Sequence, residues 1–279
     1  MIQPPVVIVG AGRVGLSLAR ALTRLEEPVR LLGRVARPAA PGVPAVESEW
    51  PAALSAAGLV VIAAPDDAIA AVVERLVALA AIREGTVVLH TSGMHDASIL
   101  APLEVQGAAT GSWHPLQSIP DGGDADRFRG VPAVLEGDDL AVLVARALAV
   151  RLEMAPILEL PAAGKARYHA AAVFAANYLV VLNGIAERLA QEAGAGEASR
   201  GLFNPIMRQV LANLDARTAT EALTGPVRRG DVGTVMAHLG VLAGLDREAY
   251  LVLAREALQL AEAAGLGAEQ AAAMRDVLR

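Results

Sequence analysis

The segment from Val6 to Arg34 limits the fold more than any other part of the chain. Val6–Val9 is a run of apolar, β-branched residues with the length of a buried strand, and the glycine-rich turn G-A-G-R-V-G follows at once. After this turn, leucine and alanine recur at helical spacing as far as Leu25. A strand, a G-x-G-x-x-G turn and a helix in this order are typical of a dinucleotide-binding site.

Each glycine of the turn has its own physical task. Gly10 permits the tight turn, Gly12 lets the backbone approach a pyrophosphate, and Gly15 lets the helix pack closely on the strand. The start of the helix offers unpaired N–H groups and the positive end of its dipole to phosphates. A turn without any ligand is the alternative, but the flanking strand and helix disfavour it. The residues that we expect around the pyrophosphate are Gly10, Ala11, Gly12, Arg13, Val14 and Gly15.

The end of the second predicted strand, residues 29–32, indicates which dinucleotide is bound. An NAD-binding domain places an acidic residue about twenty positions after the glycines, where it meets the ribose hydroxyl. This chain has Gly33-Arg34 there, with Arg37 close behind. Arg34 suits the 2′-phosphate of NADP, so we predict NADP as the cofactor. A surface arginine without a ligand is the alternative for Arg34.

Residues 1–160 alternate between apolar runs of strand length and helical patterns. Such alternation predicts an α/β protein with a mostly parallel, doubly wound sheet, which is the Rossmann-type fold. The further strands are predicted at 29–32, 58–64, 86–89, 108–111, 131–135 and 155–160, with helices at 66–80 and 138–150.

Ligands of such sheets bind outside the carboxyl ends of the strands. Polar and glycine-containing turns follow directly on several predicted strands, so they share one edge of the sheet, where we expect the cleft. The residues that we add to the cofactor site at this edge are Ala64, Pro65, Asp66 and Ser92. An aspartate is also expected to cap the helix that begins after Pro65.

From residue 161 the chain is helical throughout. Helical patterning continues to about Ala193, where Gly194 and Gly196 end it, and the later helices are predicted at 201–214, 231–243, 246–264 and 268–278. We therefore expect two domains, a nucleotide-binding domain of residues 1–160 and an all-helical domain of residues 161–279.

Composition excludes several classes of function. The net charge of −6 disfavours nucleic acid and anionic membranes as partners. The absence of cysteine excludes disulfides and fits a reducing compartment, so we expect a cytoplasmic protein without a secretory leader. No confident membrane span is expected, because the nearest stretch, residues 170–186, contains Asn177, Tyr178 and Asn183. The five histidines show no metal-ligand spacing, so no metal is predicted.

Lys165 is the only lysine among the 24 basic side chains Lys and Arg. His169 stands four residues further along the predicted helix, so ammonium and imidazole share a face. The like charge and partial burial would lower the pKa of the lysine, which could then donate a proton or stabilise developing negative charge. Asn177 follows two turns beyond His169. The alternative is a lysine that reaches solvent beside a half-buried histidine.

Two further polar residues follow predicted strands. His114 is expected in a loop beyond the strand at 108–111, and Ser92 takes the equivalent place one strand earlier. Either side chain could bind the substrate or the nicotinamide amide. A packing histidine and a capping serine are the alternatives. The proposed catalytic set is Lys165, His169, His114, Asn177 and Ser92.

Four segments together resemble an uncharacterised bacterial family of oxidoreductase-like proteins predicted to use NADP. They are Gly10–Gly15, Ser112–Gln117 (S-W-H-P-L-Q), Lys165–Tyr178 (K-A-R-Y-H-A-A-A-V-F-A-A-N-Y) and Leu223–Leu239 (L-T-G-P-V-R-R-G-D-V-G-T-V-M-A-H-L). The family joins a Rossmann-like domain to a C-terminal helical domain of unknown function, the DUF2520 type. The resemblance adds weight to residues that spacing alone leaves as structural: Thr224, Gly225, Pro226, Arg229, Asp231 and His238.

More distantly, the layout is similar to 6-phosphogluconate and β-hydroxyacid dehydrogenases and to pyrroline-carboxylate and ketopantoate reductases. In the β-hydroxyacid group, a helix-borne lysine with an asparagine four residues on serves catalysis. Lys165 matches that lysine, whereas His169 stands in place of the asparagine. Because such relatives commonly dimerise through the helical domain, the resemblance also implies a homodimer.

These observations predict an oxidoreductase that transfers a hydride between NADP(H) and a carbonyl or imine carbon of a small, anionic metabolite. Two alternatives remain open on the sequence alone. One is a sensor that binds NADP, contacts a partner protein and performs no chemistry. The other is a reductase that uses deazaflavin, because the glycine-rich turn does not exclude that cofactor.

Overall fold

The computed structural model describes residues 3–119 and 125–279. The chain divides into two compact units, Met1–Asn177 and Tyr178–Arg279. This division lies after the first turns of the helix that begins at Lys165, because Lys165 and Tyr168 bond to residues of the sheet in the first unit. The domain boundary that we place between residues 160 and 161 stays a prediction.

The first unit is built on an eight-stranded sheet with the strand order β3-β2-β1-β4-β5-β6-β7-β8. Neighbouring strands are parallel except for the antiparallel pair β6–β7, so the predicted doubly wound, mostly parallel sheet is confirmed. The strands are β1 (Val6–Val9), β2 (Val29–Leu32), β3 (Val46–Glu47), β4 (Leu59–Ile62), β5 (Val87–His90), β6 (Ala109–Pro115), β7 (Ala133–Gly137) and β8 (Ile157–Glu159).

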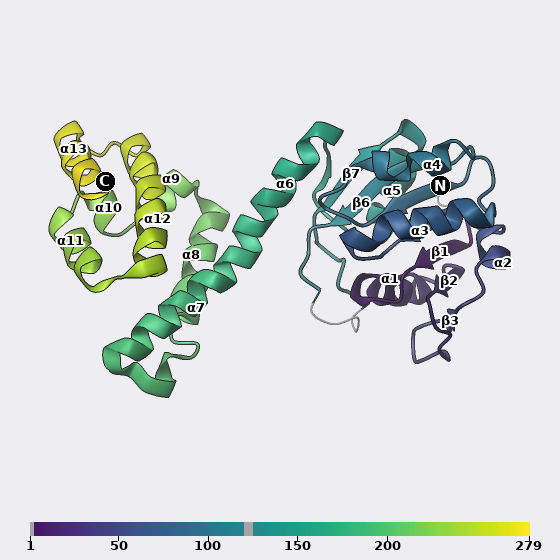
Figure 1. Ribbon diagram of the computed structural model, residues 1–279, viewed down its shortest axis with the longest axis horizontal. Coiled ribbons are helices and arrows are strands. Elements are labelled where there is room, and N and C mark those ends of the chain that lie inside the picture. Colours follow the sequence, from purple (N-terminus) through teal and green to yellow (C-terminus); the bar gives the residue numbers. More distant parts are fainter. Residues whose placement is uncertain (1–2, 120–124) are drawn as a thin grey trace. The chain divides into compact units, whose positions relative to one another are not determined.

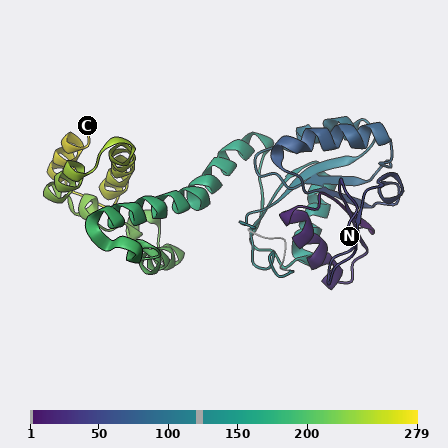
Figure 2. The same cartoon turned by 60° about the horizontal axis from the view of Figure 1, so that its bottom comes forward.

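Helices cover both faces of this sheet (Figure 1). One core, which includes Ile8 and Trp113, packs against α1 (Arg13–Arg24) and α5 (Asp139–Arg151). The other core includes Val7 and Ile62 and packs against the helices of the opposite face. Side chains alternate between the two faces along β1, as the period of a strand requires. The helices of the second face are α2 (Pro51–Leu54), α3 (Asp66–Leu79) and α4 (Ala101–Glu104), the last preceded by a 3₁₀ turn at Ala97–Leu100. Figure 2 shows the strands between the blue α3 and the dark purple α1.

Two local predictions are wrong. The strand predicted at 108–111 continues to Pro115, so His114 lies within β6 and not in a loop beyond it. His114 pairs with Val134 on β7, so the pairing of β6 with β7 continues through the polar residues that begin at Ser112. At the start of α3, Pro65 is the N-cap residue and no side chain caps the helix, so the expected aspartate cap does not form.

A continuous helical segment runs from Ala162 to Ser199. It contains a 3₁₀ turn, α6 (Lys165–Ala172), a π-helical turn at Val173–Asn177 and α7 (Tyr178–Ala190). Further irregular turns follow to Ser199, and the backbone of Gly194 leaves helical geometry with a φ of 103°. The long helix that was predicted to end near these glycines is therefore confirmed.

The membrane expectation meets one observation at this segment. The helix of 38 residues has a mean hydropathy of 1.5 in its most apolar window, and none of that window is buried. By length and composition alone this helix could cross a membrane. A core helix of a water-soluble protein passes the same test, so this observation alone is weak evidence for a membrane span.

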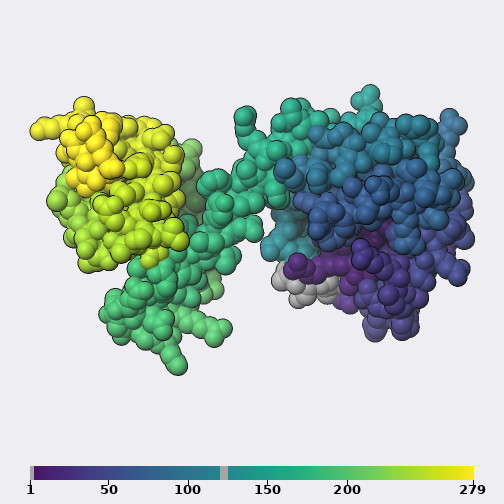
Figure 3. Space-filling model, in the orientation of Figure 1, coloured from purple at the N-terminus to yellow at the C-terminus, as the bar shows by residue number. Residues whose placement is uncertain are grey.

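The second unit consists of helices only. After α7 they are α8 (Asn204–Ala216), α9 (Ala219–Ala222), α10 (Pro226–Arg229), α11 (Val232–Val241), α12 (Gly244–Ala263) and α13 (Ala268–Val277). A small core, which includes Val235, Leu258 and Met274, joins α10 to α13. By contrast, no residue of α7 or α8 is buried, and apolar side chains of both helices lie at the surface of this unit, drawn in green in Figure 3.

Candidate functional site

The three glycines of the turn after β1 have the geometry that the motif predicts. Gly10 has a φ of +121°, and a Cβ atom there would lie 2.3 Å from the carbonyl oxygen of Ala63 at the end of β4. A Cβ atom on Gly15 would lie only 1.8 Å from the carbonyl oxygen of Gly10, so α1 packs directly on the turn. No atom of the described residues beyond its chain neighbours lies within 4 Å of a Cβ atom on Gly12, which leaves the backbone open to a ligand.

This turn forms one end of a groove of about 810 Å³ at the carboxyl ends of β1, β2 and β4. Six predicted cofactor residues line the groove: Gly10, Ala11, Gly12, Arg34, Ala64 and Pro65. Five others do not line it, namely Arg13, Val14, Gly15, Asp66 and Ser92. Gly15 is buried beneath the turn, where its task is packing, and Ser92 belongs to a different cluster at the next strand.

Arginines and one tryptophan also line the groove. Arg34 and Arg37 are both exposed, and Arg37 donates a hydrogen bond of 3.4 Å to the carbonyl oxygen of Ala11. Trp50 donates from its indole nitrogen to the carbonyl oxygen of Gly33 at 3.1 Å, and the guanidinium of Arg75 lies 3.7 Å from the centre of its ring. Sequence reasoning missed Trp50 and Arg75, because nothing near them in the sequence points to the distant glycines.

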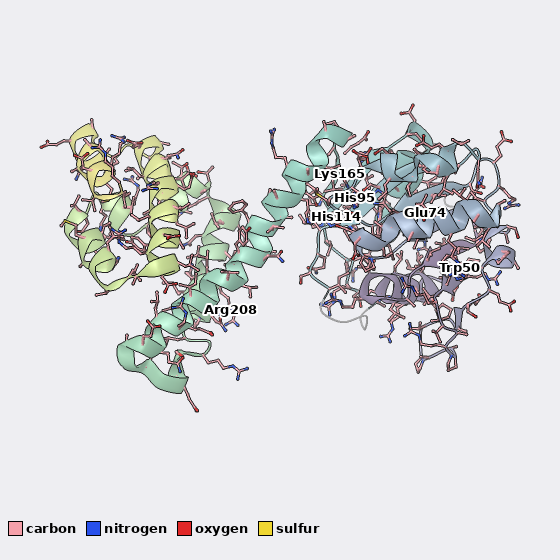
Figure 4. All side chains as sticks on the ribbon, in the orientation of Figure 1. Trp50, Glu74, His95, His114, Lys165 and Arg208 are labelled. Carbon is pink, nitrogen blue, oxygen red and sulfur yellow. The ribbon has the colours of Figure 1, made fainter. Side chains whose placement is uncertain are left out.

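Lys165 lies in the first turn of α6 with only 1% of its surface exposed. Its Nζ donates to the backbone oxygen of Ser92 at 3.1 Å and to Oγ of Ser112 at 2.6 Å. These acceptors follow β5 and lie on β6, so the ammonium sits at the carboxyl end of the sheet, next to the strands that line the groove. Figure 4 shows Lys165 and His114 together at the beginning of α6.

Burial and nearby acidic groups have opposite effects on the pKa of Lys165. Burial lowers its pKa to about 8, and the negative charges of Glu136, Asp96 and Asp66 oppose this shift. The lowered pKa was expected from the like charge of His169 together with burial; burial is the main cause, and the charges that act on Lys165 most strongly are acidic. An amine with a pKa of about 8 can both donate and accept a proton at physiological pH.

His114 and His169 approach each other over Gly93. Nδ1 of His114 shares a hydrogen bond of 2.9 Å with the hydroxyl of Tyr168, whose ring meets the imidazole edge to face. A Cβ atom on Gly93 would lie 2.9 Å from Nε2 of His114 and 3.0 Å from Nδ1 of His169, so both rings need a glycine there. Nδ1 of His169 is buried and makes no hydrogen bond within the described residues.

Burial also fixes the charge of His114. It lowers the pKa of this imidazole to about 4, with smaller effects from the charges of Lys165 and His169, so the ring is neutral at pH 7. Burial raises the pKa of Tyr168 to about 12, which keeps the phenol protonated. Sequence reasoning named His114 but not Tyr168, although the three-residue spacing from Lys165 places Tyr168 on the same side of α6.

The remaining predicted residues divide into two groups. Ser92 is buried in the cluster, but its Oγ accepts the backbone N–H groups of Met94 and His95, so the hydroxyl organises the loop. Asn177 is exposed at the end of the π-helical turn and takes part in none of the hydrogen bonds of the Lys165 cluster. The structure therefore brings together Lys165, His169, His114 and Ser92, but not Asn177.

In the second unit, the Leu223–Leu239 motif has a clear structural role. The side chain of Asp231 accepts the backbone N–H of Thr234 at 3.0 Å, so the predicted N-cap of α11 is confirmed. Nδ1 of His238 shares a hydrogen bond of 2.9 Å with the hydroxyl of Tyr250. Thr224, Gly225 and Arg229 line a cavity of about 550 Å³ within this unit.

Family models match most of the chain. The model of a Rossmann-like domain matches residues 2–115, and that of a domain of unknown function (DUF2520) matches residues 131–257. The chain thus joins a match to a Rossmann-like domain with a match to DUF2520. The second match begins ahead of β7, so it includes the last two strands of the sheet, α6 and Lys165.

Solved structures with the same fold extend over nearly the whole chain. Protein TM1727 from Thermotoga maritima has a TM-score of 0.73 and 22% identity, over 93% of this chain and 99% of that one. BF3122 from Bacteroides fragilis, named a putative NADP oxidoreductase, has the same score and identity over 91% and 97%. An imine reductase from Myxococcus stipitatus in complex with NADP⁺ has a TM-score of 0.57 and 16% identity over 99% and 93%. At these identities the likeness establishes the fold. Comparison with curated proteins found no match.

Proposed function

We propose that the chain is an oxidoreductase that transfers a hydride between NADP(H) and the carbonyl or imine carbon of a small, anionic metabolite. One observation carries this proposal: the buried ammonium of Lys165 is held by Ser92 and Ser112 at the sheet edge that also holds the glycine-rich groove. A dinucleotide groove beside a proton donor of lowered pKa is the arrangement that reduction of C=O or C=N requires. An anionic substrate is favoured because the reacting end of the site carries this positive charge.

The groove suits NADP in shape and charge. The open backbone at Gly12 and the start of α1 suit a pyrophosphate, and the exposed Arg34 and Arg37 suit a 2′-phosphate. Among the structural neighbours, BF3122 is named for NADP and the imine reductase holds NADP⁺. When bound, this cofactor would supply or accept the hydride.

Lys165 would supply the matching proton. As the substrate carbon gains a hydride, its oxygen or nitrogen takes up the electron pair of the double bond and needs one proton. Two of the three N–H bonds of the ammonium are directed to Ser92 and Ser112, which leaves the third for this atom. In the reverse direction the neutral amine would accept the proton from the alcohol or amine.

The neutral His114 would help to orient the substrate. With a pKa of about 4 its ring cannot be the proton donor near pH 7, but it can form a hydrogen bond through the nitrogen that faces Gly93. Ser92 would act through its carbonyl oxygen, by fixing the ammonium. Nothing in the site supports the place of Asn177 in the predicted catalytic set.

We also propose that the protein is a homodimer in which a second copy covers α7 and α8. Their exposed apolar residues include Val180, Val181, Ile206 and Val210, and contiguous apolar surface of this kind on a protein in water marks an interface. Light scattering of the purified protein tests this. A dimer that the double substitution Val181→Asp and Val210→Asp turns into a monomer would support it, and a wild-type monomer would contradict it.

The proposed activity is tested by following NADPH oxidation in the presence of 2-keto acids, cyclic imines and β-keto acids. Tight NADPH binding, measured by calorimetry, together with turnover of one of these classes is the expected result. NADPH binding without turnover of any class, accompanied by a nucleotide-dependent change in association with another protein, would support the sensor alternative instead.

A further inference from the structure

Three buried polar residues form a row across the sheet beneath Lys165. His90 on β5 is the register partner of Ser112 on β6, and Ser112 is the partner of Glu136 on β7. Register partners point to the same face of a sheet. Their exposures are 0%, 0% and 8%, and the neighbouring position on β4 is the apolar Ile62. Buried polar groups need partners, so this row must be satisfied by hydrogen bonds.

The outer members of the row hold the loop that follows β5. Oε2 of Glu136 accepts the backbone N–H of Ala97 at 2.7 Å. Nδ1 of His90 accepts the N–H of Ser92 at 3.2 Å, so the neutral ring donates its other N–H to the carbonyl oxygen of Asp96 at 3.1 Å. The loop is thus fixed at both ends, at Ser92 and at Asp96–Ala97.

The middle member and the loop supply the two acceptors of the ammonium. Ser112 accepts from Nζ of Lys165 through its Oγ, and the same hydroxyl faces the backbone oxygen of Ser92 at 3.3 Å, to which it donates. Ser92 accepts from Nζ through that backbone oxygen. The position of the ammonium therefore depends on the row and on the loop that the row holds.

Glu136 differs from its neighbours because it is the charged member of the row. Burial raises the pKa of its carboxyl, while the hydrogen bond from Ala97 and the charge of Lys165 lower it. For Lys165, burial is the largest influence and lowers the pKa, and Glu136 is the strongest of the charges that oppose it. A buried cation without a counter-charge loses its proton, so the two groups depend on each other.

We propose that Glu136 is a positioning residue for Lys165. Its buried carboxylate holds the loop at Ala97, so that Ser92 can receive the ammonium, and it provides the negative charge that keeps this amine protonated inside the fold. The catalytic consequence rests on the proposed function, whereas the effect on the amine does not. The charged and titratable groups that face Lys165 from the surrounding elements are Glu136, Asp96, Asp66, His90 and His114.

The single lysine of the chain makes a direct test possible. Protein labelled with ¹³Cε-lysine gives one lysine signal, whose chemical shift against pH reports the pKa of Lys165. In Glu136→Gln the amide oxygen can still accept from Ala97, but the charge is gone. We expect the midpoint of the titration to fall by about one pH unit, as loss of a nearby opposite charge does.

A matched control is Glu159→Gln on β8, an exposed glutamate that pairs with Arg146 at 3.2 Å. Its lysine titration should coincide with that of the wild type. Glu136→Asp keeps a charge near the amine but shortens the reach to Ala97, so its midpoint should lie closer to the wild type than that of Glu136→Gln. An unchanged midpoint in a folded Glu136→Gln protein would overturn the proposal.

Two further measurements keep the proposal testable. If Glu136→Gln does not fold, the wild-type lysine signal should still show a second, smaller inflection at acid pH as Glu136 takes up a proton, and its absence would contradict the inference. If the protein proves to be an NADPH-dependent reductase, the basic limb of the kcat profile should move with the lysine midpoint. A shifted midpoint without any turnover would refute the proposed function and leave this inference intact.

Discussion

The nucleotide groove and the lysine site, meaning Lys165 with Ser92, Ser112, His114 and Glu136, lie at the same edge of the sheet but are built differently. The groove is formed by the backbone of a short turn and by side chains that include the exposed Arg34 and Arg37. The lysine site is formed by buried side chains together with the half-buried His114, and Nζ of Lys165 meets groups that are 53 and 73 residues away in sequence. Binding therefore depends on local backbone geometry, whereas the proposed chemistry depends on strand register.

The same contrast holds for electrostatics. Charges at the groove are in contact with water, so they attract phosphates without a large cost of desolvation. At the lysine site, burial is the main cause of the lowered pKa values of Lys165, about 8, and of His114, about 4. Substitutions in the two regions should consequently separate stability, cofactor binding and turnover.

The largest effect is expected from Gly15→Ala. Its Cβ atom would lie 1.8 Å from the oxygen of Gly10, so α1 must move away from the turn. We expect a loss of stability of more than about 4 kcal/mol, together with loss of NADPH binding. Chemical denaturation measures the stability and calorimetry the binding of NADPH.

Gly12→Ala is the matched variant, because its Cβ meets no atom of the described residues beyond its chain neighbours. It should keep the wild-type stability and still weaken NADPH binding about tenfold or more. Equal stability of the two variants would contradict this account of the turn.

Lys165→Met should separate chemistry from cofactor binding. The substitution keeps an unbranched side chain of similar length but removes the proton donor, so kcat should fall by about 10²- to 10⁴-fold. The dissociation constant of NADPH should stay within about twofold of the wild type, because Lys165 does not line the groove. Arg167→Met, an exposed neighbour on α6, is the control for a general effect on the helix. Equal losses of kcat and of NADPH affinity would show that Lys165 serves the fold or the cofactor only.

His90 should make the lysine site sensitive to acid. Burial lowers the pKa of His90 from 6.5 to about 4, so the unfolded chain binds more protons than the folded protein between these values. Stability should thus fall as the pH falls from 6.5 to 4, by about 3 kcal/mol from this residue. In His90→Gln the loss over this range should be smaller by that amount, even if the variant is less stable at pH 7. His238→Gln, which replaces an exposed histidine, should keep the wild-type slope in denaturation experiments at pH 6.5 and pH 4. Parallel slopes in all three proteins would refute the role of His90.

The two regions differ in how well the sequence alone predicts them, because they are built differently. The strand, the turn and the helix of the groove are continuous in sequence, so residue types and spacing suffice to predict them. Arg34 is predictable because it follows the next strand along. Trp50 and Arg75 are not, since they come from the segment before α2 and from the middle of α3, and only the folded sheet places them at the groove.

The lysine site is predictable only in outline. The uniqueness of Lys165 and the position of Ser92 after a strand point to the correct edge of the sheet. The roles of Ser112 and Glu136 depend on the pairing of β6 with β7, and the polar run from Ser112 obscures the continuation of β6 to Pro115. A usable signal was nevertheless present: His90, Ser112 and Glu136 occupy strand positions where buried sheets ordinarily place apolar residues. Nothing in the sequence shows why residue 93 must be glycine, because the space for a side chain there is taken by two imidazoles from distant parts of the chain.

The smallest effect is expected at the exposed end of the groove, from Arg34→Gln. The guanidinium would form charge-assisted hydrogen bonds with a 2′-phosphate, but Arg37 lies beside it and can take over part of the interaction. The dissociation constant of NADPH should therefore rise only about tenfold, while that of NADH, which lacks the phosphate, should not change. Calorimetry with NADPH and with NADH measures the two dissociation constants. Arg146→Gln on α5, away from the groove, is the control and should leave both constants unchanged. If Arg34→Gln weakened NADPH and NADH equally, Arg34 would contact a part that the two cofactors share, and if it changed neither, it would be a surface arginine without a ligand.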